Sequence, residues 1–151
     1  MTPSQSSSTG QDIRTAEVGE TAWTDAFAAK SEDAFGSAFA EDVVLEATAL
    51  LKPLHGRTNV QTSMGAASNY YTSLAFTHEA TNGDRTYIEW EATGASGVRF
   101  SGVTVLTRNE AGLIRHISIS HRPLAAVLEF SAEMYQRTKG KIQEGHFRPN
   151  D

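Results

Sequence analysis

The chain has 151 residues, of which 39% are hydrophobic and 21% are charged, and its formal net charge at pH 7 is -5. This length and composition are typical of one globular domain with a single core. Nucleic acid is excluded as an expected partner, because binding to phosphates needs clustered Lys and Arg and the sequence has no such cluster. The absence of cysteine excludes disulfides, thiolate metal sites and cysteine nucleophiles.

The first 20 residues are polar, rich in Ser and Thr, and without apolar periodicity. Such a segment buries too little surface to offset its ordering entropy, so we expect residues 1–20 to be a disordered tail. They show neither the basic start nor the apolar core of a signal peptide, and no apolar run approaches the roughly 20 residues that span a bilayer. We therefore expect a cytoplasmic protein with no membrane partner.

Two short helices are predicted in residues 21–40. Ser31 can cap the second helix, with Glu32 and Asp33 in its first turn. The apolar residues that recur at helical spacing are Trp23, Phe27, Phe35, Ala38 and Phe39. An aromatic stripe could line a ligand cavity, but at this spacing it more often forms core, and we assign it to the core.

The next elements are a strand and a third helix. An apolar and β-branched run at residues 43–51 predicts the strand, which Pro53 ends. Residues 58–61, Thr-Asn-Val-Gln, fit a capping box that starts the helix, and Gly65 would allow close packing. The apolar residues on one face of this helix are Val60, Met64, Ala67 and Tyr71.

The rest of the chain predicts an antiparallel meander and a last helix. Four alternating runs separated by turn residues predict strands at residues 74–79, 86–92, 100–108 and 113–121. Pro123 suits the first position of a helix. The face that this helix lays on the sheet would be Leu124, Val127, Leu128, Ser131, and Met134 or Tyr135. We expect one domain over residues 21–137, with residues 138–151 as a polar tail that frays from Gly140.

Three pieces of sequence carry a family resemblance: residues 39–46 (FAEDVVLE), residues 54–57 (LHGR) and residues 110–114 (EAGLI). Together with the element order, they resemble the nuclear transport factor 2-like superfamily, in its SnoaL-like and ketosteroid-isomerase-like branch. The resemblance implies an α+β cone, in which a curved antiparallel sheet wraps around N-terminal helices and encloses an apolar pocket. It also implies a homodimer joined through the sheet. Members include isomerases, dehydratases, epoxide hydrolases, polyketide cyclases and proteins with no known chemistry.

The chain departs from the catalytic pattern of these relatives. The carboxylate base of ketosteroid isomerase falls at Ala47, and the protonated carboxyl of its oxyanion hole falls at Thr104. The acid/base aspartate of many SnoaL-like members falls at Arg122, or at His121 if the register slips by one. Proton chemistry in this chain would therefore depend on imidazole or on another carboxylate.

Strand alternation predicts which side chains face the cone, because successive residues point to opposite faces. His121 shares a face with Ile117 and Ile119, and His78 shares one with Leu74 and Phe76. The predicted pocket lining is His78, Trp90, Thr104 and His121, with Met64 and Tyr71 from the third helix. We expect Glu46, Glu89 and Glu91 on the solvated or dimer-facing side, with Glu46 turned inward if its strand carries a bulge.

Two function classes remain open. The first is a cofactor-independent isomerase, dehydratase or cyclase in which His78 and His121 are the catalytic acid and base. Its small apolar or aromatic substrate would be bound by Trp90, Thr104, Met64, Tyr71 and Arg122. The second is a non-catalytic ligand-binding or dimeric accessory protein, because a lone histidine on an apolar face is more often a core residue. A cone filled by its own aromatic side chains would favour this second class.

No metal is expected in either function class. The sequence has neither a His-x-x-x-His pair nor a facial set of carboxylates. His78 and Glu79 are neighbours on one strand and therefore face opposite sides of the sheet.

Overall fold

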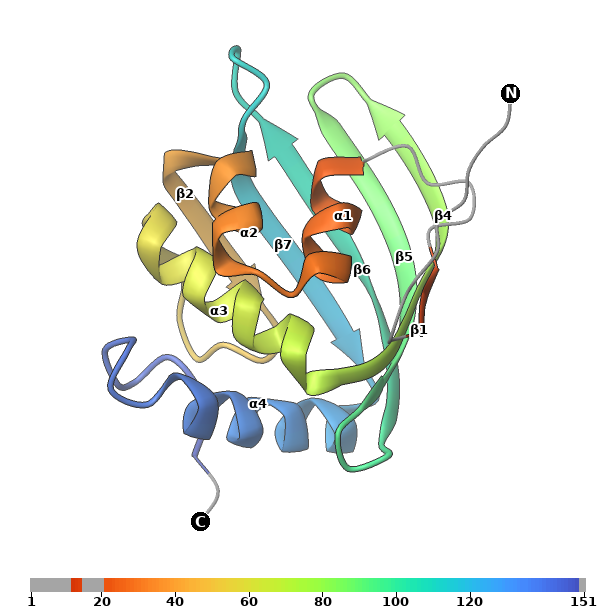
Figure 1. The fold of residues 1–151 in the computed structure, drawn as a ribbon, viewed down its shortest axis with the longest axis vertical. Helices are drawn as coiled ribbons and strands as arrows, with labels where there is room; N and C mark the ends of the chain where they lie inside the picture. Colours follow the sequence, from red (N-terminus) through yellow and green to blue (C-terminus); the bar gives the residue numbers. More distant parts are fainter. Residues whose placement is uncertain (1–11, 15–20, 150–151) are drawn as a thin grey trace.

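The computed structural model describes residues 12–14 and 21–149. The elements in chain order are β1 (Asp12–Arg14), α1 (Thr21–Ala29), α2 (Glu32–Ala38), β2 (Phe39–Ala47), β3 (Leu54–His55), α3 (Arg57–Tyr70), β4 (Tyr71–Asn82), β5 (Arg85–Gly94), β6 (Arg99–Arg108), β7 (Ile114–Arg122) and α4 (Leu124–Thr138). Helices α1, α2 and α3 lie on one face of a curved sheet, and α4 crosses one end of it (Figure 1). This arrangement confirms the predicted α+β cone. No helix in the described part of the chain is long and apolar enough to cross a membrane.

The sheet has the strand order β1-β4-β5-β6-β7-β2-β3. Strands β4 to β7 form the predicted antiparallel meander. At the two sides, β1 pairs in parallel with β4 and β2 pairs in parallel with β7, so the sheet is mixed. The predicted N-terminal tail falls mainly on residues 1–11 and 15–20, which lie outside the described residues.

The first strand begins earlier than predicted. Strand β2 starts at Phe39, which is also the C-cap of α2 and has extended backbone angles, φ -101° and ψ 143°. The chain therefore passes from helix to strand without a loop. Phe39 pairs with Ile114 of β7, and the regular pairing resumes at Val44, so Glu41 and Asp42 lie where the register shifts.

Local signals at the helix starts are right in one case and wrong in another. Ser31 caps α2 as predicted, since its Oγ accepts a hydrogen bond from the backbone N–H of Ala34 at 3.4 Å. The predicted capping box is wrong: α3 already begins at Arg57, and Gly56 stands at the N-cap with φ 95°. Such a positive φ suits glycine, so the turn geometry sets the helix start.

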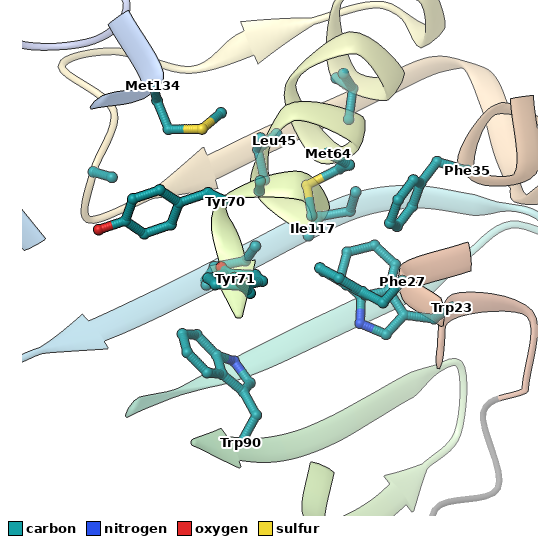
Figure 2. Close-up of a cluster of buried hydrophobic side chains, with 14 of the residues drawn as sticks. Trp23, Phe27, Phe35, Leu45, Met64, Tyr70, Tyr71, Trp90, Ile117 and Met134 are labelled. Atoms are coloured by element: carbon teal, nitrogen blue, oxygen red, sulfur yellow. The ribbon is translucent and has the colours of Figure 1, made fainter. Parts of the chain in front are cut away.

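The aromatic stripe of α1 and α2 forms core, as predicted. The rings of Trp23, Phe27 and Phe35 lie against one another, with centroids 5.0 to 5.7 Å apart. Figure 2 shows Tyr71 in the middle of the buried cluster, with Trp90 on one side and Met64 on the other. The apolar interior of the cone is therefore continuous from α1 to β7.

Helix α4 starts one residue later than predicted and is rotated. Pro123 precedes the helix as its N-cap, and Leu124 is 70% exposed. Because α4 crosses the end of the cone against α3 and β7, its buried face is shifted toward Phe130. The buried residues of this helix are Ala126, Val127, Phe130, Ser131, Met134 and Thr138.

Residues 139–149, here called the C-terminal strap, were expected to fray but pack on the domain. Ile142 and Phe147 are buried. The backbone N–H of Leu51 donates to the carbonyl oxygen of His146 at 2.7 Å, and the N–H of Arg148 donates to Ser131 Oγ at 2.9 Å. The strap thus closes the end of the cone that α4 borders.

Candidate functional site

Three residues paired side by side across β5, β6 and β7 place the His121 imidazole in the interior of the cone. Trp90 on β5 pairs with Gly102 on β6, and Gly102 pairs with His121 on β7. Because Gly102 has no side chain, the Trp90 ring can lean across β6, and its centroid lies 5.6 Å from that of His121. A Cβ at Gly102 would lie 2.6 Å from Trp90 Cζ2. We did not predict a role for Gly102, although a glycine inside an apolar strand signals such a close approach.

His121 lies in an aromatic enclosure. Its ring centroid is 6.1 Å from that of Phe100 and 5.5 Å from that of Phe130, in addition to the contact with Trp90. Burial lowers the pKa of His121 to about 4, so the imidazole is neutral at pH 7. Its Nδ1 is buried and has no hydrogen-bond partner among the described residues. This imidazole can therefore still form one hydrogen bond with a bound group.

The backbone holds His121 in place. Its N–H donates to Thr48 Oγ1 at 3.1 Å, and the N–H of Thr48 donates to the carbonyl oxygen of Ile119 at 3.0 Å. These two bonds fix the end of β7 to the segment that follows β2. The imidazole is thus presented by a rigid element rather than by a loop.

Thr104 and Trp90 are joined by a buried hydrogen bond. The Trp90 Nε1–H donates to Thr104 Oγ1 at 3.0 Å, and both side chains are buried. The Thr104 hydroxyl therefore orients the indole against His121. The Thr104 hydroxyl oxygen is therefore already engaged by the indole.

Replacing Thr104 with valine is expected to lower the free energy of unfolding by about 2 kcal/mol, because the Trp90 N–H would lose its buried acceptor. Thr104→Ser keeps the hydroxyl and is the matched control, with an expected loss below about 1 kcal/mol. Urea unfolding followed by circular dichroism measures both. Equal losses for the two variants would contradict the role of this hydrogen bond.

The prediction that His78 faces the cone is wrong. A β-bulge shifts the register between Phe76, which pairs with Trp90, and His78, which pairs with Glu89. The extra residue reverses the alternation, so the His78 side chain is 77% exposed and its Nδ1 lies 3.2 Å from Glu89 Oε1. The predicted pair of interior imidazoles therefore does not form.

Arg122 also lies outside the cone, contrary to its predicted place beside the substrate. It is exposed and follows His121 directly, so the two side chains leave opposite faces of β7. The glutamates expected on the outer side are exposed as well: Glu46, Glu89 and Glu91. Glu46 Oε1 lies 3.6 Å from His116 Nε2 on that outer face.

Two small interior cavities among the described residues share Tyr71 and Ile119 in their walls. The larger, about 20 Å³, is also lined by Met64 and His121, and the smaller, about 10 Å³, is also lined by Trp90 and Thr104. Cavities of this size hold about one water molecule. The cone is therefore filled by its own side chains, and a ligand can enter only if one of them moves.

The groups that face these cavities are neutral at pH 7. Neither cavity is lined by an Asp or Glu among the described residues. Burial and the neighbouring Tyr70 raise the pKa of Tyr71 above its usual range, so its hydroxyl stays protonated. In the described ranges no group of three or more His, Cys, Asp and Glu side chains could hold a metal ion.

A curved mixed sheet around helices, with a small apolar interior, defines the nuclear transport factor 2-like class. Within it, residues 21–117 match the model of the SnoaL-like domain, and the chain belongs to this family. No curated protein matches the sequence.

Three solved structures illustrate the shared fold. A conserved bacterial protein with a cystatin-like fold from Silicibacter pomeroyi DSS-3 has a TM-score of 0.73 at 22% identity, covering 78% of this chain and 82% of its own. A steroid delta-isomerase from Pseudomonas aeruginosa has a TM-score of 0.71 at 16% identity; the match covers 80% of this chain and 93% of the isomerase. A hypothetical protein with a ketosteroid isomerase-like fold from Catenulispora acidiphila DSM 44928, in complex with trimethylamine, has a TM-score of 0.60 at 21% identity; the match covers 72% of this chain and 88% of that protein.

Proposed function

We propose that this domain binds one small, neutral, mostly apolar molecule at the His121 end of the cone. The observation that carries the proposal is the buried Nδ1 of His121. It has no hydrogen-bond partner in the described part of the chain, and aromatic rings surround the imidazole. An unpaired buried polar atom is costly, and a ligand with one hydroxyl, amide or carbonyl group would satisfy it. A protein with a ketosteroid isomerase-like fold has been solved in complex with trimethylamine, which supports binding of a molecule of small size by this fold.

The ligand is expected to be uncharged. The cavity beside His121 is lined mainly by aliphatic and aromatic side chains, without an Asp, Glu, Lys or Arg among the described residues. A charged ligand would lose its hydration there without gaining a counter-ion. The imidazole itself is neutral at pH 7, so it offers a hydrogen bond rather than a charge.

The second candidate is an enzyme at the same site: a cofactor-independent isomerase, dehydratase or cyclase with His121 as the acid/base group. The fold shared with a steroid delta-isomerase favours it. A pKa of about 4 argues against it, because general bases work best when their pKa is near the operating pH. The filled cone and this low pKa together put ligand binding ahead of catalysis.

A panel of phenols, indoles and small enones, followed by calorimetry and by chromatography of the products, tests the proposal. Saturable binding without conversion, lost in His121→Phe, is the expected result. His78→Ala is the matched control and should leave binding unchanged, because His78 is exposed. Conversion that depends on His121 would establish the enzyme instead, and binding that His121→Phe leaves intact would overturn the proposed site.

We also propose a homodimer joined through the outer face of the sheet. Tyr87, which is 37% exposed, pairs with the half-buried Val105, and Val103 lies two residues away on the same face. Light scattering at micromolar concentration is expected to give twice the mass of one chain. Val105→Lys should yield a monomer, whereas Glu110→Lys in the exposed β6–β7 turn should not. A monomeric wild type would contradict the proposal.

A further inference from the structure

The larger interior cavity is closed by a side chain from the C-terminal strap. Phe147 lines this cavity together with His121, Phe130 and Met134, and it is 5% exposed. It comes from outside the sheet and helices that form the cone, and it pairs with Leu50 through an isolated β-bridge. A phenyl ring thus stands at the end of the cone where the proposed ligand would bind.

The attachment of the strap is slight. It contains no helix or strand. The N–H groups of Lys141 and Ile142 donate to the Thr138 carbonyl oxygen at the end of α4, and the described backbone bonds to the rest of the domain are those from Leu51 to His146 and from Arg148 to Ser131. Gly140 and Gly145 have φ values of 81° and 103°, a conformation in which glycine carries no steric penalty. Segments with so few hydrogen bonds open at low free-energy cost compared with the core.

We propose that Phe147 occupies the ligand site, and that a neutral aromatic molecule with one hydroxyl or N–H group takes its place when the strap moves away. This inference rests on the proposed function. It specifies the class of ligand and the segment that regulates its binding. A benzene ring fits the space that a phenyl leaves, and its polar substituent would satisfy the His121 imidazole. The strap and the ligand therefore compete, and the affinity measured for the whole protein is reduced by the fraction of molecules in which the strap is closed.

Phenol is the probe, titrated into the full-length protein and two variants and followed by NMR. Phe147→Ala removes the competing ring and should bind phenol at least about tenfold more tightly than the wild type. Ile142→Ala removes a buried strap side chain that does not line the cavity, so it loosens the strap without making room. It should also bind more tightly, by about fivefold to tenfold.

Hydrogen exchange of the wild type supplies the direct readout. Saturation with phenol should accelerate exchange at the amides of Leu51 and Arg148, which the closed strap protects. Unchanged protection at saturation, or equal phenol affinity in the wild type and both variants, would overturn the strap mechanism. The absence of phenol binding to folded Phe147→Ala would overturn it too.

The proposed function is tested separately, by comparing the binding of phenol with that of benzene. If His121 holds the polar group, Phe147→Ala prefers phenol to benzene, and adding His121→Phe removes that preference. Loss of the strap effect with a retained phenol preference would overturn this inference alone. A strap that opens for benzene and phenol equally would overturn the role of His121 while supporting the displacement of Phe147.

Discussion

Replacing Gly102 with alanine is expected to lower the free energy of unfolding by about 3 kcal/mol, because overpacking a closed core forces its neighbours to move. The new Cβ would clash with the Ser120 carbonyl oxygen, which is backbone, and with the Trp90 ring, which already packs against His121. Neither neighbour can yield as a flexible side chain would. Urea unfolding followed by circular dichroism measures the loss, and tryptophan fluorescence should report the displaced indole.

Gly36→Ala is the matched control for this substitution. The three atoms nearest to a Cβ at Gly36 all belong to the end of the Gln61 side chain, which can rotate away. Alanine also improves helix propensity by about 1 kcal/mol over glycine, so the net change should be small. If Gly102→Ala proves as stable as Gly36→Ala, the Gly102 contact does not hold Trp90 against His121.

The sequence predicts the order of the main elements well because they carry local signals, whereas the short strands β1 and β3 were missed. Alternation and the turn residues identify the meander, and Ser31 identifies the start of α2. Where tertiary contacts decide, local signals fail: β2 begins at Phe39 because it pairs with β7, and α3 begins after Gly56 because of the turn geometry. The family resemblance, which the match over residues 21–117 confirms, fixed the fold class.

The interior was only partly predictable. Alternation places His121 inward because β7 runs without interruption from Ile117 to His121. The same rule fails at His78, where a bulge that no local pattern announces adds one residue to β4. The closing role of Phe147 was also missed, because the strap is polar in composition and its two buried apolar residues are paired only by long-range contacts.

His121 is expected to make the protein less stable as the pH falls from 6.5 to about 4. The unfolded chain binds a proton near the ordinary histidine pKa of about 6.5, whereas burial holds the folded pKa at about 4. Between these values only the unfolded state is protonated, so stability decreases by about 1.4 kcal/mol for each pH unit and by about 3 kcal/mol in total. Above pH 7 both states are neutral, and this contribution to the pH dependence vanishes.

His121→Phe isolates this effect from that of the carboxylates, which also titrate at acid pH. Phenylalanine preserves the contacts with Trp90, Phe100 and Phe130 but has no titratable group. The difference in unfolding free energy between the wild type and His121→Phe should therefore grow by about 3 kcal/mol from pH 7 to pH 4. Parallel profiles for the wild type and His121→Phe would mean that burial does not disfavour the charged imidazole, which would contradict the enclosure of His121 by aromatic rings.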